Sequence, residues 1–204
     1  MIHIDVQEKS FGHTPVLRNI RFDIPKGQTL ALFGPSGIGK STLLRLISGI
    51  DTRFSGTIDR PERIGIVFQE PTLLPWRSAL ENLRIVHPSL GHDACLEALA
   101  SVGLEDKADA FPGQLSLGQQ RRLSLARGFG ASPELLIMDE PFVSLDEKTA
   151  EDMLTLTEQL IARDTPTTIF VTHARDEAER LASRIITLAG HPASIQSDTK
   201  GDFS

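Results

Sequence analysis

The chain has 204 residues, of which 40% are hydrophobic and 24% charged, a composition that predicts one globular domain and excludes global disorder. Its formal net charge of −6 at pH 7 argues against a dedicated binder of duplex nucleic acid, and its single cysteine, Cys95, excludes a disulfide framework and a cysteine-rich zinc cluster. No apolar run reaches the roughly 20 residues of a membrane helix, and the start lacks the pattern of a secretory signal, so we expect a soluble chain that stays where it is made and can dock onto a membrane protein.

Both ends of the chain show weak patterns. Residues 2–8 and 16–24 alternate loosely between apolar and polar side chains, which predicts two strands joined by a turn over 12–15. The end of the chain, residues 189–204, contains glycine and proline and few apolar side chains. We expect a short strand or turn there, followed by a frayed tail.

Three short runs are continuously apolar or β-branched, which is typical of strands covered on both faces in a parallel sheet. These runs are residues 30–33, 135–138 and 168–171. The helical patterns that follow them are residues 43–50, 150–161 and 174–182. Because ligands of α/β sheets bind beyond the carboxyl ends of the strands, we expect the chemistry just after Phe33, Met138 and Val171.

The middle of the chain, about residues 77–131, differs from the segments on either side. Its helical patterns lie near residues 79–86, 92–102 and 116–129, and it shows no clear strand. We therefore predict a single domain over residues 1–204, of the α/β class. It has a core with a mainly parallel sheet, an N-terminal antiparallel β subdomain, and an all-helical subdomain inserted at about 77–131.

A glycine-rich loop follows the first of the three apolar runs. It matches the pattern G-x-x-x-x-G-K-[ST] between a strand and a helix, which is the context of a phosphate-binding loop. Its residues are Gly34, Pro35, Ser36, Gly37, Ile38, Gly39, Lys40, Ser41 and Thr42. Backbone N–H groups of such a loop bind phosphate, Lys40 reaches the β- and γ-phosphates, and the Ser41 hydroxyl binds Mg²⁺. The alternative is a glycine turn that Ser41 caps; the setting favours a nucleoside triphosphate site.

Two adjacent acids, Asp139 and Glu140, follow the second apolar run. A carboxylate at this position can hold Mg²⁺ through a water molecule, and its neighbour can orient and deprotonate an attacking water. We therefore assign Asp139 to the metal and Glu140 to catalysis, and two acids here favour hydrolysis over transfer to another acceptor. The alternative is the start of a turn or helix, where acidic residues are common.

Two further features each have two interpretations. His173 comes two residues after the third apolar run, where it can donate to a γ-phosphate, although a lone histidine is usually a surface residue. Ser116 and Gln119 form the pattern S-x-x-Q, a capping box at the start of a helix. The alternative for this helix is that Ser116, Gly118 and the helix N-terminus bind an anion.

Together these residues resemble the ATP-binding subunit of ABC transporters, over nearly the whole chain. The glycine-rich loop resembles Walker A, and Leu135 to Glu140 resemble Walker B with its catalytic glutamate. The segment Leu115, Ser116, Leu117, Gly118 and Gln119 resembles the signature LSGGQ. The remaining matches are Ser144 to Asp146 as the D-loop, His173 as the switch histidine, Gln69 as the Q-loop glutamine and Phe11 as the aromatic that stacks on adenine. A core position is an equal alternative for Phe11.

The resemblance implies a P-loop NTPase core for the predicted α/β fold, and an ATPase that uses ATP and Mg²⁺. Glu140, His173 and Gln69 would act in catalysis, and Ser41, Gln69 and Asp139 would hold the metal, Asp139 through water. It implies a head-to-tail dimer, of two copies or with a homologous ATPase, in which the signature of one protomer covers ATP on the Walker A of its partner. It also implies a cytoplasmic position on the inner face of the cell membrane. There the chain would dock to a membrane permease through a groove between the helical subdomain and the Q-loop, and act with a substrate-binding protein indirectly.

Two features depart from the family pattern. Leu117 replaces the usual glycine at the third signature position and adds bulk near the expected γ-phosphate. The segment between Gly49 and Gln69 is short, so we expect its usual hairpin to be trimmed. Residues 73–76, with the sequence LLPW, resemble importers of nitrate, sulfonate and taurine. The alternative is that these residues meet a permease helix of any kind or pack internally.

The favoured function is therefore the ATP-hydrolysing subunit of a transporter that powers solute import through a separate permease. The alternative is a soluble ABC ATPase that acts on nucleic acid or ribosomes. Such proteins often carry two cassettes or a long helical insertion, whereas this chain has one phosphate loop and an acidic charge. A non-hydrolysing regulator is disfavoured by Glu140 and His173, and a small-molecule kinase or GTPase leaves the signature, Q-loop and D-loop unexplained.

Overall fold

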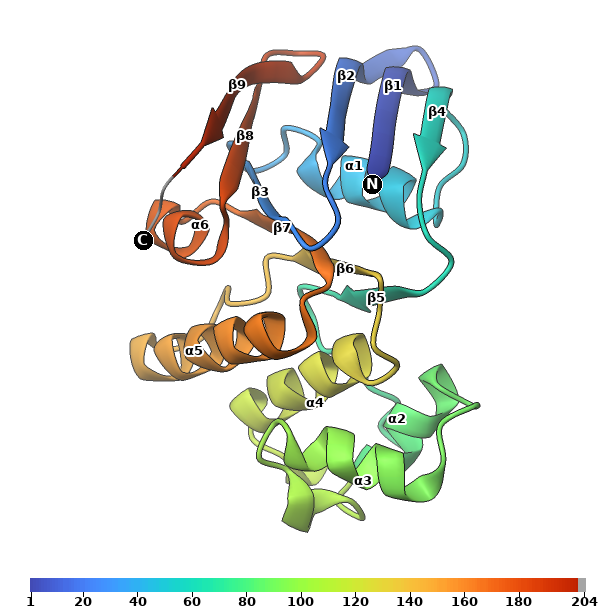
Figure 1. Ribbon diagram of the computed structural model, residues 1–204, viewed down its shortest axis with the longest axis vertical. Helices are drawn as coiled ribbons and strands as arrows, with labels where there is room; N and C mark the ends of the chain where they lie inside the picture. The colour runs from blue at the N-terminus through green and yellow to red at the C-terminus, as the bar shows by residue number, and fades with distance from the viewer. Residues whose placement is uncertain (202–204) are drawn as a thin grey trace.

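A six-stranded sheet forms the centre of the fold in the computed structural model, which describes residues 1–201 (Figure 1). In spatial order its strands are β5 (Ile64–Val67), β6 (Leu135–Asp139), β7 (Thr167–Thr172), β3 (Thr29–Phe33), β8 (Arg184–Ala189) and β9 (Ser194–Lys200). All neighbours pair in parallel except β8 and β9, which are antiparallel. The predicted mainly parallel sheet is confirmed.

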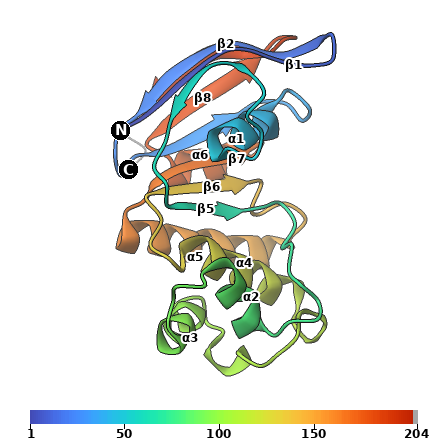
Figure 2. The same ribbon diagram turned by 90° about the vertical axis from the view of Figure 1, so that its right-hand side faces the viewer.

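The inner strands of this sheet are covered on both faces. On β3, Leu30 and Leu32 pack into a hydrophobic cluster with helix α1 (Lys40–Ser48) and the N-terminal strands, whereas Ala31 packs into a second cluster on the other face. The second cluster contains side chains of α5 (Glu147–Asp164) and α6 (Arg175–Leu181). Figure 2 shows α1 on one side of β6 and β7 and α5 on the other side. Burial on both faces explains why these strands are continuously apolar.

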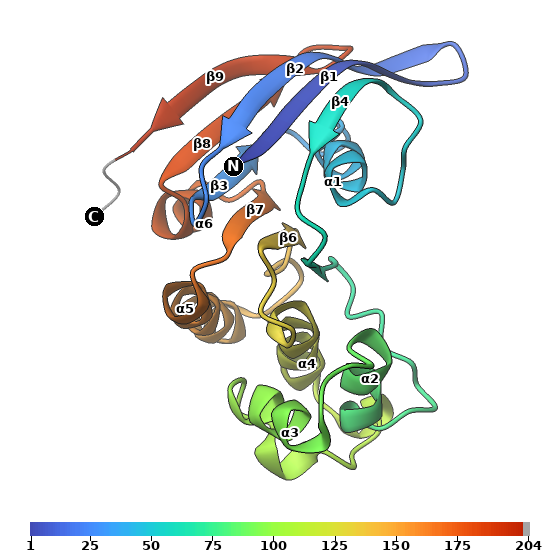
Figure 3. The ribbon, with the colours of Figure 1, turned by 45° about the vertical axis from the view of Figure 1, so that its right-hand side comes forward.

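A second sheet of three antiparallel strands lies over α1 (Figure 3). Its strands, in the order β2-β1-β4, are β2 (Thr14–Ile24), β1 (Ile2–Phe11) and β4 (Ser55–Asp59). The predicted N-terminal antiparallel subdomain is confirmed. The predicted turn over 12–15 is too long, because β1 continues to Phe11 and Gly12, at φ 60°, reverses the chain within two residues.

The segment between Gly49 and Gln69 contains two strands, β4 and β5, that the sequence pattern did not predict. They pair with different sheets, β4 with β1 and β5 with β6. β4 has almost no buried side chains, so it lacks an apolar signal. A Cβ atom on Gly56 would lie 1.9 Å from the Asp5 carbonyl oxygen, so the close approach of β1 requires glycine there.

The chain between β5 and β6 forms the helical layer at the bottom of Figure 1. Its helices are α2 (Ala79–Val86), α3 (His92–Ala100) and α4 (Leu117–Phe129), with short 3₁₀ turns at Glu105–Lys107 and Pro112–Gln114. This is the inserted helical subdomain of the predicted fold class, and its exact limits of 77 and 131 stay a prediction. No helix of residues 1–201 is both long enough and apolar enough to cross a bilayer.

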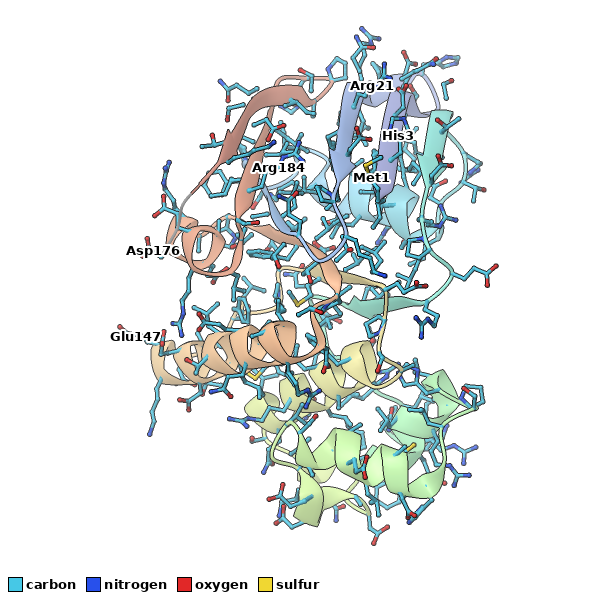
Figure 4. The ribbon with its side chains drawn as sticks, viewed as in Figure 1. Met1, His3, Arg21, Glu147, Asp176 and Arg184 are labelled. Atoms are coloured by element: carbon cyan, nitrogen blue, oxygen red, sulfur yellow. The ribbon has the colours of Figure 1, made fainter. Side chains whose placement is uncertain are left out.

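The end of the chain is more ordered than predicted. Instead of a short strand or turn followed by a frayed tail, residues 194–200 form the seven-residue strand β9. Arg184, labelled on β8 in Figure 4, donates to both carboxylate oxygens of Asp198 on β9, at 2.7 and 2.6 Å. A polar edge strand has few apolar residues that a sequence pattern could detect. The buried Arg184 holds this strand to β8 through its two hydrogen bonds to Asp198. Residues 202–204 of the predicted tail lie outside the described part of the chain.

Candidate functional site

The carboxyl ends of three neighbouring strands, β3, β6 and β7, meet at one edge of the six-stranded sheet. Phe33 at the end of β3 pairs with Thr172 at the end of β7, and Asp139 at the end of β6 pairs with Val171. This register brings together the glycine-rich loop, the acidic pair and His173, which are far apart in the sequence. The three segments therefore form one candidate site.

The glycine-rich loop leaves the first N–H groups of α1 without a side-chain cap. Gly37 and Gly39 have φ of 77° and 112°, which other residues rarely adopt. A Cβ on Gly39 would also lie 2.8 Å from the Leu17 side chain. Helix α1 begins at Lys40 with Gly39 as its N-cap and no capping side chain, so the alternative in which Ser41 caps the helix is wrong. The helix N-terminus therefore offers N–H donors to an anion.

Lys40 is the cation of this loop and is only 4% exposed. Its Nζ donates to the carbonyl oxygens of Gly34 at 2.8 Å and Pro35 at 2.9 Å. Burial lowers the pKa of Lys40, and the negative charges of Glu140 and Asp139 oppose this shift. The ammonium is thus held inside the loop, where it can neutralise phosphate oxygens.

Ser41 and Asp139 connect α1 to β6. The Ser41 hydroxyl donates to Asp139 Oδ1 at 3.0 Å. Burial is the main cause that raises the pKa of Asp139; the nearby charge of Glu140 adds to the shift and the Ser41 hydrogen bond opposes it. A cation beside this carboxylate would offset the cost of burying its negative charge.

Glu140 stands between the loop lysine and the histidine. Its carboxylate lies 3.9 Å from Lys40 Nζ and 3.7 Å from His173 Nδ1. The Glu140 backbone has φ 45°, in the left-handed region, and its N–H donates to the Val171 carbonyl at 3.1 Å. Backbone strain of this kind concentrates at functional residues, because the surrounding structure must hold it in place. The strained turn orients the Glu140 side chain toward both basic groups.

His173 is 54% exposed. Its neighbours in the chain, Thr172 and Ala174, form hydrogen bonds at the start of α6. The Thr172 hydroxyl donates to the Glu177 carboxylate and accepts from the Ala174 N–H, the latter at 3.0 Å. Burial is the main cause that raises the pKa of Glu177. These bonds hold the chain on both sides of His173. The sequence analysis missed Thr172 and Glu177, and its only available signal was an acid in the helical turn after the histidine.

Comparison with known proteins agrees with this geometry. A family model described as ABC transporter matches residues 17–143, more than half of the chain. The chain belongs to the ABC transporter family. An aliphatic sulfonates import ATP-binding protein, SsuB 1 of Paracoccus denitrificans (strain Pd 1222), is 44% identical over 183 residues, covering 88% of this chain and 76% of the relative. SsuB 3 of Paraburkholderia xenovorans (strain LB400), with the same description, is 42% identical over 195 residues, covering 94% and 79%.

Two solved structures of an ABC transporter cassette share this fold. The dimeric structure of the bacterial cassette MJ0796 has a TM-score of 0.82 at 29% identity. The dimeric post-hydrolysis state of the same cassette, bound to ADP and Pi, has a TM-score of 0.80 at 28% identity. Each alignment covers 98% of both chains. The predicted P-loop NTPase fold is therefore confirmed.

Two residues that the ABC resemblance assigns to the site are exposed. Gln69 is exposed just after β5, and within residues 1–201 no hydrogen bond or ion pair joins it to Ser41 or Asp139. Its catalytic and metal roles stay predictions. Phe11, at the end of β1, is 51% exposed, so the alternative of a core side chain is wrong.

The signature-like segment lies at the start of α4 in the helical layer. The Ser116 hydroxyl accepts from the Gln119 N–H at 3.2 Å, and the Gln119 side chain accepts from the Ser116 N–H at 2.9 Å. The predicted capping box is therefore confirmed. Leu117 is 47% exposed, and a Cβ on Gly118 would lie 3.1 Å from Thr149 at the start of α5. Binding of an anion by this segment stays a prediction.

Two arginines of α4, which the sequence analysis did not single out, connect this helix to the segments beside the site. Arg121, 6% exposed, donates to the Val143 carbonyl at 3.3 Å, while its Nε and Nη1 have no partner among the described residues. Arg127 donates to the carbonyl oxygens of Pro71 at 3.3 Å and Thr72 at 3.0 Å. The available signal was that these arginines stand close to apolar residues of the predicted helix, such as Leu123, Leu125 and Ala126. They attach α4 to the chain just beyond Glu140 and just beyond Gln69.

Proposed function

We propose that this ABC family member is the ATPase that powers solute import through a separate membrane permease. The observation that carries the proposal is the Glu140 carboxylate, 3.9 Å from the loop lysine and 3.7 Å from His173 Nδ1. That arrangement joins a phosphate loop to a general base, which is what hydrolysis of a bound triphosphate needs. The relatives named as import ATP-binding proteins support the coupling to transport.

ATP would bind with its phosphates on the loop of residues 34–42 and its adenine against Phe11. The N–H groups at the start of α1 and the Lys40 ammonium would hold the phosphate oxygens. Phe11 has an exposed ring at the end of β1, which suits stacking against a flat base.

Mg²⁺ fits the donor atoms at this edge of the sheet. Ser41 and Asp139 supply hard oxygen atoms of the kind that Mg²⁺ prefers, and a cation would stabilise the ionised form of the buried Asp139. Ser41 and Gln69 would bind the ion directly and Asp139 through water. When bound, Mg²⁺ would supply positive charge that offsets the negative charge of the phosphates.

Hydrolysis would use Glu140 as the general base. Glu140 takes a proton from water, the water oxygen bonds to the γ-phosphorus, and the bond from phosphorus to the ADP oxygen breaks. His173 and Lys40 stabilise the negative charge on the γ-phosphate oxygens. Gln69 would orient the attacking water.

The test is Glu140→Gln, which keeps the shape of the side chain and removes the base. We expect the turnover number to fall by at least about 100-fold while ATP affinity stays within about threefold. Glu134→Gln is the matched control, because Glu134 precedes β6 at the opposite end of the strand. Steady-state phosphate release and calorimetric ATP binding give the two quantities. Wild-type turnover in Glu140→Gln would mean that another group is the base.

Two copies, or this chain with a homologous ATPase, would form a head-to-tail dimer. Ser116, Leu117, Gly118 and Gln119 of one protomer would then cover the γ-phosphate held by its partner. The dimeric cassettes with the same fold support this arrangement. The start of α4 has the N-terminal dipole that attracts phosphate, and its exposed Leu117 would lie in the dimer interface.

The permease would dock on the segment of residues 69–77. Asn82, buried on α2, accepts from the Leu74 N–H at 2.8 Å and donates to the Arg77 carbonyl at 3.0 Å. This turn leaves Trp76 68% exposed, which disfavours internal packing of that residue, and an exposed aromatic side chain is typical of a partner site. We expect Trp76→Glu to keep the fold and basal ATPase but to lose permease binding in a pull-down. Retained binding would place the docking surface elsewhere.

The proposed cargo is a small organic anion of the aliphatic sulfonate type, delivered by a substrate-binding protein from outside the membrane. This rests on the names of the relatives and on residues 73–76. The ATPase itself would lie on the cytoplasmic face, bound to the permease. In the reconstituted complex, binding protein loaded with an aliphatic sulfonate should stimulate ATP hydrolysis more than binding protein offered nitrate.

A further inference from the structure

Strand β1 buries a lysine where its pattern predicts a solvent-exposed position. Ile2, Ile4 and Val6 are buried in strict alternation, so Glu8 would be the next inward side chain. A register shift against β4 between Val6 and Glu8 changes the alternation, and Lys9 becomes the buried residue instead. Lys9 is 1% exposed. Because burying a charged ammonium costs free energy, it needs compensating partners.

The Lys9 ammonium is attached to the chain that follows α1. Its Nζ donates to Asp51 Oδ2 at 2.6 Å and to the Arg53 carbonyl at 2.7 Å. Asp51 is itself fixed, because its Oδ1 accepts from the Arg53 N–H at 2.9 Å and its N–H donates to the Arg45 carbonyl at 3.0 Å. Lys9 therefore joins the tip of the β1–β2 hairpin to the carboxyl end of α1.

The Lys9 ammonium also lies over the ring of Phe11. Lys9 Nζ lies 4.7 Å from the centroid of the Phe11 ring, within the range of a cation–π contact. Two N–H groups of the ammonium go to oxygen atoms, so one remains for the ring. The cation covers one face of Phe11, and about half of the side chain stays exposed. The Phe11 ring is thus held on one face by the Lys9 ammonium, while part of the side chain stays exposed.

We propose that Lys9 is a positioning residue for the nucleotide base. This inference rests on the proposed ATP site. Helix α1 carries the phosphate loop at its N-terminus and the Lys9 anchor just past its C-terminus, so Lys9 sets the place of the base platform relative to the phosphates. A cation beneath the ring also draws π electrons toward itself, which favours stacking of an electron-rich purine on the opposite face.

The experiment compares ATP with inorganic tripolyphosphate, a probe that has the phosphates but no base. The variant is Lys9→Met, which keeps the length of the side chain and removes the charge. We expect its ATP affinity to fall roughly three- to tenfold, between the values of an exposed and a desolvated cation–π contact, while its affinity for tripolyphosphate stays unchanged. Lys26→Met, at an exposed lysine after β2, is the matched control and should bind both probes like the wild type.

A double-mutant cycle separates positioning from general stability. In a Phe11→Ala background, Lys9→Met should have no further effect on ATP affinity, because the platform it positions is gone. An equal loss for ATP and tripolyphosphate, or an undiminished effect in Phe11→Ala, would overturn the inference. If a thermal unfolding experiment shows that Lys9→Met is not folded, Asp51→Asn replaces it. That variant keeps a side-chain oxygen as the acceptor for the Arg53 N–H and turns an amide donor toward the ammonium.

Failure of this inference is distinguishable from failure of the ATP site. If Phe11→Ala binds ATP like the wild type while Lys40→Ala does not, Phe11 is not the base platform and the inference about Lys9 fails, but the ATP site stands. If Lys40→Ala also binds ATP like the wild type, the proposed ATP site fails.

Discussion

The phosphate-loop edge of the sheet and the start of α4 each contain a helix N-terminus at which the sequence predicts an anion, but the two helix ends are built differently. At the sheet edge, the Ser41 hydroxyl donates to Asp139, the Glu140 carboxylate lies 3.9 Å from Lys40 Nζ, and α1 has no capping side chain. At the start of α4, Ser116 and Gln119 satisfy each other in a capping box. The first region brings its charged groups together within one chain, whereas the second is a helix end whose capping groups are already paired with each other. The anion predicted for the second region would therefore have to come from a partner.

The two regions are linked through backbone rather than through their functional side chains. Arg121 reaches the carbonyl of Val143, and Arg127 reaches the carbonyls of Pro71 and Thr72. A movement of α4 would therefore move the chain just beyond Glu140 and just beyond Gln69. This difference supports the proposal that one protomer supplies the reacting groups and that the helical layer acts on them indirectly.

The largest expected effect separates the two regions by mutation. Lys40→Ala should weaken ATP binding by at least about 100-fold, because the β- and γ-phosphates lose their main cation. Ser116→Arg should leave ATP binding by the single protomer within about twofold and abolish turnover. Calorimetry with Mg²⁺ and phosphate release measure these effects. Equal loss of ATP affinity in both variants would mean that Ser116 serves the site of its own chain.

A mixture of these two variants tests whether the regions meet across a dimer. In a head-to-tail heterodimer, one composite site receives both damaged parts and the other receives an intact Lys40 and an intact Ser116. Random pairing of equal amounts should restore trapped nucleotide to about a quarter of the wild-type level. Both variants must fold, and heterodimers must be shown by differential tags. Heterodimers without trapping would break the shared-site model and leave Ser116 as a helix cap.

A smaller effect tests the link between α4 and the Q-loop segment. Arg127→Met should destabilise the protein by roughly 2 kcal/mol, because two charged hydrogen bonds to the 71–72 backbone are lost. It should also lower permease-stimulated ATPase more than basal ATPase. Arg122→Met is the matched control, since Arg122 donates to the Val102 carbonyl within the helical layer. Equal effects of both variants on stimulation would show that the link is only structural.

The smallest effect concerns the charge of Asp139. Burial raises its pKa, so the ionised carboxylate destabilises the native state at neutral pH. Asp139→Asn should raise the melting temperature of the nucleotide-free protein by roughly 2 to 4 °C, limited by partial exposure. The gain should shrink as pH falls through the folded-state pKa, because wild-type Asp139 then becomes neutral. A variant that melts below the wild type at neutral pH would contradict a cost of burial at this residue.

Local patterns in the sequence determined the parts of this protein that depend on neighbours along the chain. Ser116 and Gln119 are three residues apart and cap one helix, and Gly39 and Lys40 open another helix directly after a strand. The apolar runs of β3, β6 and β7 were readable because burial on both faces removes polar side chains. These features were enough to predict the α/β fold and the position of the candidate site.

Tertiary structure alone decided the features that join distant segments. β4 has nearly no buried side chains and exists because Gly56 fits against β1. Lys9 is inward only because the register shifts along β1, and its partner, Asp51, is 42 residues away. Arg121 of the helical layer donates to the carbonyl of Val143, which lies after β6 and outside that layer. Strand pairing, register and the burial of charge depend on which distant segment of backbone lies next to a strand. The pattern of apolar and polar residues along one strand does not specify that segment.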